Sequence, residues 1–197
     1  EKMKSKNKKL GTGLLIKNLE DGHELNISFV NDMAFDSTSK FLAYAVVDTS
    51  GTKNGIYVVD LSNNDLSPTT IHSGNNNYYG NLSWNGKKRQ LAFTAASLDS
   101  TYEAGDADIH IWNSDNGELS TAVQAEETDE KWALRVENNL QWTKDGNRLF
   151  FGLLEREMVE IDSESEKERD STATVDIYNR DEILDKKEVD VWHWDDP

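Results

Sequence analysis

The sequence contains no cysteine and only two prolines. Without cysteine the chain can form no disulfide, no thiolate metal site and no cysteine nucleophile. It also lacks an apolar run of about 18 residues, the length that predicts a membrane-spanning helix, and no segment resembles the hydrophobic part of a secretory signal. We therefore expect these residues to form a soluble piece with no membrane span, and the cysteine content leaves the cellular compartment open.

Catalytic motifs are also missing. The nearest string to a G-x-S-x-G nucleophile motif, GNLSW (80–84), lacks the second glycine and falls on an expected strand. NSDNGE (113–118) lacks the ligand spacing of a calcium loop and is typical of a hairpin turn. The sequence therefore predicts no catalytic residue, no metal and no cofactor. Four histidines are dispersed without an H-E-x-x-H pattern, and we interpret each as a surface or strand-edge residue: His23, His72, His110 and His193.

Basic residues are outnumbered, with 21 Lys and Arg against 37 Asp and Glu and a formal net charge of −16. This balance argues against a nucleic-acid partner, because nucleic-acid binders present a basic face. Two segments are locally extreme. Residues 1–9, EKMKSKNKK, form a Lys-rich arm, and residues 154–170 form an acidic run. We expect both segments to be solvated.

A short hairpin pattern occurs three times. An aromatic residue precedes a polar turn, and a leucine follows exactly seven positions later in each copy: Phe35 and Leu42, Trp84 and Leu91, Trp142 and Leu149. Each leucine is followed by a small or apolar residue and then by an aromatic one. Alternating apolar runs joined by Asp, Asn, Gly and Lys indicate antiparallel hairpins. Three copies in register indicate a repeat.

A second pattern follows each hairpin. Alternating strands that end in an Asp or Asn turn occupy 55–64, 108–117 and 190–196, with a related copy at 13–22, and polar strands follow at 23–30, 67–74 and 118–125. The repeating unit is thus four strands, with periods of 49 and 58 between the hairpin aromatics. Units of this kind build β-propeller blades.

We therefore predict an all-β fold, a β-propeller segment of about three four-stranded antiparallel blades plus part of a preceding one. The expected boundaries are 10–30 for the end strands of the preceding blade, 31–74 and 79–125 for two blades, and 138–197 for an incomplete blade with an acidic insertion at 153–187. The units differ mainly in the spacer between their second and third strands, which runs from Tyr44 to Gly55, from Phe93 to Asp108 and from Phe151 to Val189.

Four of the six tryptophans fall at repeat-equivalent positions, which favours packing between neighbouring blades over ligand stacking: Trp84, Trp112, Trp142 and Trp194. Trp132 lies in the irregular stretch 126–138, outside these columns. It is the better candidate for a surface contact.

The order of these strings resembles the N-terminal propeller of bacterial peptidases of the prolyl oligopeptidase family. The most specific parts are NGIYV (54–58) with the following stretch to Trp84, and VDVWHWDDP (189–197). The sequence departs from the family at Asn85, where related sequences often have Asp. The resemblance covers residues 10–197 and implies a propeller placed before a C-terminal α/β-hydrolase domain that carries Ser, Asp and His.

The resemblance also implies a role. Such a propeller caps the hydrolase domain, restricts entry to short peptides and holds the substrate N-terminus, in some members through paired glutamates of an insertion. Glu155 and Glu157 lie in an insertion here and are the corresponding candidates. The parent protein is then a serine peptidase, and we expect it in the periplasm or outside the cell.

Two other interpretations stay open. The chain could belong to a periplasmic binding or scaffold propeller of the TolB-like kind, without enzymatic activity, or it could be a complete small antiparallel domain. The first residue is Glu1 rather than Met and the last follows an aromatic cluster, so we expect a piece of a longer protein. Propellers need about 4 to 8 blades to close, so the open ends of such a piece invite a homodimer.

Overall fold

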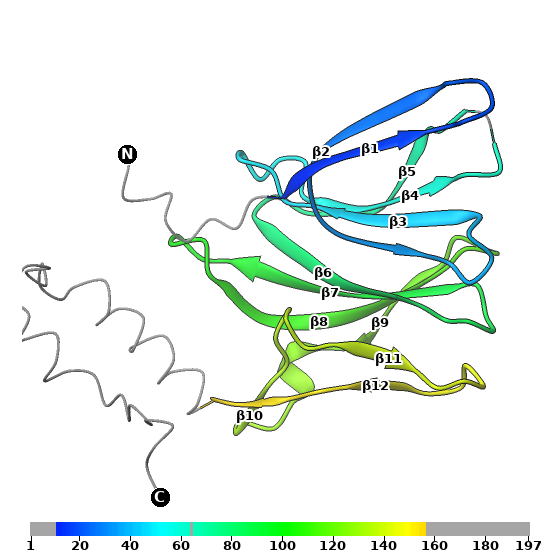
Figure 1. The fold of residues 1–197 in the computed structure, drawn as a ribbon. Coiled ribbons are helices and arrows are strands. Elements are labelled where there is room, and N and C mark those ends of the chain that lie inside the picture. Colours follow the sequence, from blue (N-terminus) through cyan, green and yellow to red (C-terminus); the bar gives the residue numbers. More distant parts are fainter. Residues whose placement is uncertain (1–10, 64, 157–197) are drawn as a thin grey trace, which may run out of the picture. The chain divides into compact units, whose positions relative to one another are not determined.

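β-strands dominate the computed structural model, which describes residues 11–63 and 65–156 (Figure 1). Four expected features lie outside the described residues: the Lys-rich arm, Glu157, most of the acidic insertion, and the strand that contains Trp194. The statements below concern the described part of the chain.

The first sheet contains five strands, and strands adjacent in the chain are adjacent in the sheet, in the order β1-β2-β3-β4-β5. Every pairing is antiparallel. The bounds are β1 Thr12–Lys17, β2 Glu24–Phe35, β3 Phe41–Val46, β4 Gly55–Asp60 and β5 Pro68–Ser73. The polar segment 67–74, which was expected to be a strand, corresponds to β5.

β2 bends sharply in its middle. Its first half pairs with β1, its second half pairs with β3, and the register shifts between Val30 and Asp32. Phe29, at the bend, has a φ of 63°, a left-handed conformation that costs free energy for a large side chain. Figure 1 shows the second half of β2 running back past the first. The sequence patterns at 23–30 and 31–35 are therefore two arms of one bent strand.

The hairpin of β1 and the first half of β2 packs on one face of the first sheet. Its apolar side chains contact a buried cluster on β3 and β4 that includes Tyr44 and Val46. The contributing hairpin residues are Leu14, Ile16, Leu25, Ile27 and Phe29. The second half of β2 therefore forms a four-stranded layer with β3, β4 and β5. The hairpin of β1 and the first half of β2 covers one face of this layer.

The second sheet contains four antiparallel strands in the order β6-β7-β8-β9. Its bounds are β6 Asn77–Trp84, β7 Gln90–Leu98, β8 Ala104–Asn113 and β9 Leu119–Val123. A 3₁₀ helix, η2 (Ala125–Glu127), and two short pairs follow. These pairs are β11 (Leu140–Trp142) with β12 (Leu149–Phe151), and β10 (Trp132–Ala133) with β13 (Leu154–Glu155).

The seven-residue spacing is explained by the pairing register. Phe35 lies opposite Leu42, Trp84 opposite Leu91, and Trp142 opposite Leu149. Each aromatic residue and its leucine are therefore direct cross-strand partners and point to the same face of their hairpin. The predicted repeat is confirmed in all three copies.

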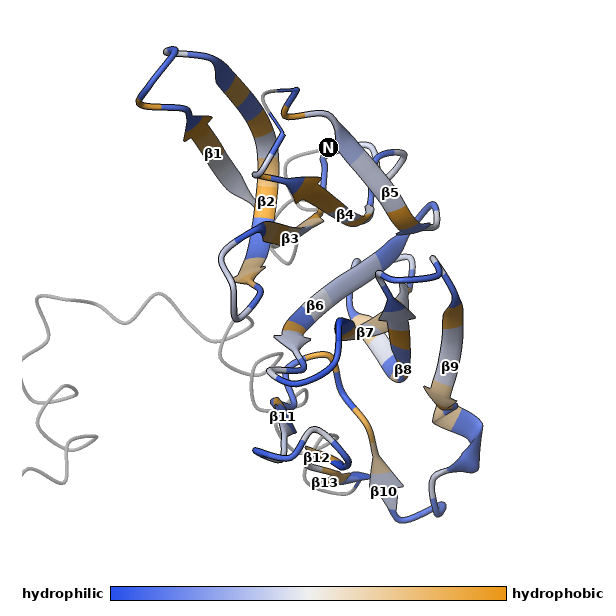
Figure 2. Cartoon of the chain, turned by 90° about the vertical axis from the view of Figure 1, so that its right-hand side faces the viewer, coloured by the Kyte–Doolittle hydropathy of each residue, from blue (hydrophilic) through white to orange (hydrophobic). Residues whose placement is uncertain are grey.

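Both faces of the middle strands are buried, because each sheet has a neighbour on either side. Ala43 and Ala45 on β3 and Phe93 on β7 belong to the cluster between the two sheets. Ala92 and Ala96 on β7 point the other way, toward a cluster that includes Leu140 of β11. The turns are hydrophilic (Figure 2). The structure thus confirms the predicted all-β fold class, with stacked antiparallel sheets as in a partial β-propeller.

Trp84 and Trp142 each join their own sheet to the sheet that precedes it in the chain. The indole Nε1 of Trp84 donates to the Ala34 carbonyl oxygen at 3.0 Å, and Nε1 of Trp142 donates to the Ser83 carbonyl oxygen at 3.0 Å. Ala34 and Ser83 each directly precede the hairpin aromatic of the preceding sheet, so the two bonds are repeat-equivalent. Trp84 and Trp142 thus each lie between consecutive sheets, and Trp112, on the same sheet as Trp84, contacts it edge to face with centroids 6.2 Å apart.

One expected spacer is wrong. The segment from Phe93 to Asp108 was expected to be a long connection, but β7 extends to Leu98 and β8 begins at Ala104. Small and apolar residues, among them Ala95, Ala96 and Ala107, fit both faces of the buried sheet and lengthen the strands.

Replacing Trp142 by Phe should lower the free energy of unfolding by roughly 1 to 2 kcal/mol, because Phe keeps one aromatic ring but loses both the hydrogen bond to Ser83 and the packing of the second ring of the indole. Urea unfolding followed by circular dichroism measures this change. Trp132, which is 41% exposed, gives the matched control, since Trp132→Phe should change stability by less than about 0.5 kcal/mol. Equal effects of the two substitutions would contradict the assigned role of the indole bond.

Candidate functional site

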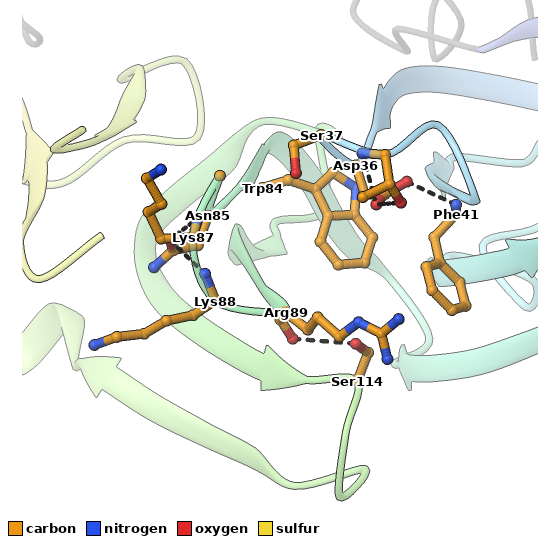
Figure 3. A pocket seen from close by; sticks show the side chains of 11 residues that line it. Asp36, Ser37, Phe41, Trp84, Asn85, Lys87, Lys88, Arg89 and Ser114 are labelled. Atoms are coloured by element: carbon orange, nitrogen blue, oxygen red, sulfur yellow. Dashed lines mark hydrogen bonds between the residues drawn. The ribbon is translucent and has the colours of Figure 1, made fainter. Parts of the chain in front are cut away.

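A cavity lies at the turn end of the two sheets. It has a volume of about 240 Å³ and lies between the β2–β3 turn and the β6–β7 turn, with Ser114 of the β8–β9 turn at its edge (Figure 3). The rings of Phe41 and Trp84 approach each other to 6.3 Å between centroids on its wall. The cavity therefore exists where two hairpin turns splay apart above the packed cores.

The β2–β3 turn is organised by Asp36. Its carboxylate accepts hydrogen bonds from the backbone N–H groups of Thr38 at 3.0 Å and Phe41 at 2.8 Å, and from the Thr38 hydroxyl. Partial burial of the Asp36 carboxyl favours its neutral form, but these hydrogen bonds together outweigh burial and hold its pKa below the ordinary value. Asp36 is therefore ionised, and both of its carboxylate oxygens accept hydrogen bonds from its own turn.

The charged residues that line the cavity are Arg89, Lys87, Lys88 and Asp36. The guanidinium carbon of Arg89 lies 5.8 Å from the centroid of the Phe41 ring, and its Nη1 pairs with Asp115 at 3.1 Å. The backbone oxygen of Arg89 accepts from the Ser114 hydroxyl at 3.2 Å. Figure 3 shows the Arg89 side chain extending toward Phe41, whereas those of Lys87 and Lys88 point away from the cavity.

Asn85 ties the β6–β7 turn to the next hairpin. Its Oδ1 accepts from the N–H groups of Lys87 and Lys88, and its Nδ2 donates to the Gly146 carbonyl oxygen at 3.0 Å. Asp could cap the turn but, when ionised, has no donor for Gly146. Asn85, which is buried, therefore both caps its own turn and bonds the neighbouring sheet.

Asparagine side chains also bond backbone carbonyl oxygens in the next segment of the stack. Asn31 of β2 donates from Nδ2 to the Tyr79 carbonyl at 2.7 Å, and Asn81 of β6 donates to the Val136 carbonyl. At the other end, Asn54 donates to the Asn77 carbonyl at 2.7 Å. Asparagine is typical of turns in the sequence pattern, and this bonding role between segments is not expected from it. The recurrence of Asn31 and Asn81 a few positions before the hairpin aromatic was the available signal.

Two histidines from neighbouring sheets stack on each other. His110 lies on the inner strand β8 and is 9% exposed, which corrects its interpretation as a surface or strand-edge residue, whereas His72 lies on the edge strand β5. His72 of β5 and His110 of β8 have ring centroids 5.1 Å apart with planes at 24°. His72 Nδ1 bonds the Tyr79 hydroxyl at 2.9 Å, and His110 Nδ1 bonds the Thr121 hydroxyl at 3.2 Å. An imidazole has a polar rim and a flat face, so it can pack in an apolar interface while its nitrogens remain bonded.

Burial lowers the pKa of both imidazoles. For His110, the neighbouring His72 lowers the pKa further and Asp108 raises it by a smaller amount. Both rings are therefore favoured in the neutral form in the folded chain. His23, by contrast, lies on the exposed β1–β2 turn, as predicted, and His193 lies outside the described residues.

The predicted site residues are not brought together with this cavity. Glu155 is exposed on β13 opposite Trp132 of β10. Its neighbour Arg156 pairs with Asp106 at 2.7 Å, and Arg135 pairs with the same carboxylate at 3.4 Å. Trp132 is exposed, as expected for a surface residue.

Among residues 11–63 and 65–156, no three His, Cys, Asp or Glu side chains are close enough to hold one metal ion. The same residues contain no helix with the length and apolar character needed to cross a bilayer. The NSDNGE segment forms the predicted turn, in which Asn113 Oδ1 accepts from the Asp115 N–H at 2.9 Å.

No family model and no curated protein matches the sequence. Among solved structures, the chain is similar to the β-propeller domain of the Trilobed protease from Pyrococcus furiosus, which is described as having an open velcro topology. The two share 16% identity with a TM-score of 0.42, and the match covers 72% of this chain and 44% of that one. The chain therefore spans less than half the length of that structure.

The stacked histidines predict a pH-dependent stability. Because their pKa values are lowered in the folded state, the unfolded chain binds more protons between the folded values and about 6.5, and stability falls as pH drops through that interval. Above about pH 6.5 the imidazoles are neutral in both the folded and the unfolded chain, so the two histidines no longer make stability depend on pH. Thermal unfolding between pH 7.5 and 5 should show a falling midpoint, and His72→Gln/His110→Gln should show a smaller slope. His23→Gln is the control, and a slope unchanged by the double substitution would refute the assignment.

Proposed function

We propose that this chain is the noncatalytic propeller portion of a serine exopeptidase or oligopeptidase, in which it caps an α/β-hydrolase domain and restricts access to short peptides. The observation that supports this proposal is the repeated sheet stack, in which Trp84 and Trp142 make equivalent bonds to the preceding sheet. The peptidase assignment comes from the sequence resemblance in NGIYV and the strings around it.

A capping role is supported by sheets that are buried at their centres and carry their connecting turns at their ends. Leu42, Leu91 and Phe93 are fully or almost fully buried, so the strands can hold connecting loops in fixed positions. A ring of such units leaves an axial opening too narrow for a folded protein, while a short peptide can pass. We place the parent protein in the periplasm or outside the cell.

The two faces at the ends of the described stack carry exposed apolar side chains. Met33 and Phe35, on β2, are 51% and 54% exposed, and Phe150, on β12, is 60% exposed. Phe150 points away from Leu149 and Phe151, which pack on the second sheet. We propose that further blades cover these faces in the parent protein and that a second copy covers them in this chain alone, as a homodimer.

The size restriction is tested in the parent protein, whose sequence beyond Pro197 must first be shown to contain a G-x-S-x-G motif. A series of N-blocked peptides of increasing length should show kcat/KM falling sharply once the peptide no longer fits the opening. Replacing the serine of that motif by Ala should abolish all hydrolysis. Rates independent of length would contradict the cap, and further blades without a hydrolase domain would favour the scaffold interpretation.

Glu155 is proposed to bind the free amine of the substrate. In the full-length protein, Glu155→Ala should raise KM about tenfold for peptides with a free N-terminus and leave KM unchanged for N-blocked peptides, because only the former lose an ion pair. Glu118, exposed in the β8–β9 turn, provides the control substitution Glu118→Ala. Equal effects on both peptide classes would exclude this role for Glu155.

A further inference from the structure

Charge is unevenly distributed among the turns at one end of the stack. We define the inner turns as residues 36–40, 85–89 and 143–148, which join the first and second strands of the two sheets and the third hairpin. They contain six basic and two acidic residues, a formal charge of +4, so the rest of the chain carries −20. The basic residues are Lys40, Lys87, Lys88, Arg89, Lys144 and Arg148.

The inner turns are neighbours in space. The Phe41–Trp84 ring contact places the first beside the second, and the bond from Asn85 to the Gly146 carbonyl places the second beside the third. In Figure 1 the turns of β2–β3, β6–β7 and β11–β12 all lie at the same end of the strands. They therefore form one continuous surface, which we call the basic ridge.

The two carboxylates in the ridge are ionised but bond within their own turns and, in the described part of the chain, form no ion pair with the cations of the ridge. Asp36 accepts from its own turn as described above, and Asp145 accepts from the Thr143 hydroxyl and from the N–H and Nδ2 of Asn147. These bonds lower the pKa of Asp145. Within the described residues Lys87 and Lys88 make no ion pair, and their side chains extend outward in Figure 3. The cations are thus available to a partner.

The turns that border the ridge are acidic. The β8–β9 turn, whose Ser114 hydroxyl bonds the Arg89 carbonyl oxygen, carries Asp115 and Glu118. The β4–β5 turn, whose Leu61 N–H bonds the Lys40 carbonyl oxygen, carries Asp65. A long, uniformly charged polyanion such as nucleic acid would be repelled on crossing these borders. A short peptide with a few carboxylates can lie along the ridge without reaching them.

We propose that the basic ridge binds an acidic peptide segment and that the exposed guanidinium of Arg89 pairs with one of its carboxylates. Only Nη1 of Arg89 is engaged, with Asp115, which leaves guanidinium donors for an incoming carboxylate. This inference does not depend on the proposed peptidase role.

The test measures binding of fluorescent 12-residue peptides to the full 197-residue chain by anisotropy. One peptide alternates Asp and Glu with Gly and Ser, the second has Asn and Gln at the acidic positions, and a 12-nucleotide single-stranded DNA is the third probe. The variant Lys87→Glu/Lys88→Glu removes the proposed contacts. Lys53→Glu/Lys131→Glu makes the same charge change on exposed residues outside the turn end and is the matched control.

The acidic peptide should bind in preference to the neutral one, more weakly as salt rises. Lys87→Glu/Lys88→Glu should raise its Kd about tenfold, Arg89→Met should also raise it, and the control pair should change it less than about twofold. Unchanged thermal midpoints verify folding. The proposal would be overturned if both charge-reversal variants lost affinity for the acidic peptide equally. It would also be overturned if the acidic and neutral peptides bound equally well, or if the DNA bound more tightly than the acidic peptide.

Discussion

The fold depends on the contact between consecutive sheets at the hairpin aromatic. Trp84 and Trp142 each fill the space between two sheets and donate an indole N–H to a carbonyl of the preceding one. That carbonyl lies at the edge of an apolar interface, so the bond satisfies two polar groups that burial would otherwise penalise. Because both bonds use the same strand position, they set the same spacing and orientation between successive sheets.

The middle strands of the two described sheets are buried on both faces. Along β3, Leu42 and Tyr44 face one neighbour while Ala43 and Ala45 face the other, and all four are buried. A sheet with two apolar faces is stable only between two others. The exposed Phe35 and Phe150 mark the faces where the described stack has no further sheet, and they explain why the chain is understood as part of a larger repeat.

The stacking geometry also determines where chemistry can gather. Bringing the first strands together brings their turns together, so charges distant in sequence, such as those of Lys88 and Lys144, belong to one surface. The cavity between Phe41, Trp84 and Arg89 follows from the same arrangement, since the turns diverge where the aromatic side chains end. The repeat thus brings the inner turns together, and the basic residues of these turns make the surface a basic ridge.

The fold was largely predictable because the repeated spacing is itself a register: Trp84 and Leu91 are seven apart because they face each other across a hairpin. The bend at Phe29 was not predictable, since a left-handed residue leaves no mark when it is not glycine. The roles of Asn85 and of the His72–His110 stack were also hidden, because each depends on a partner in another sheet. The cavity could not be inferred for the same reason.

Exchange of the tryptophan indole protons with solvent, followed by NMR in deuterium oxide, tests the central claim most directly. Trp84 and Trp142 should keep their indole protons far longer than the exposed Trp132, because exchange requires the sheets to separate. Comparable exchange rates for all three would show that the indole bonds do not join the sheets, and the account of the stack would be wrong.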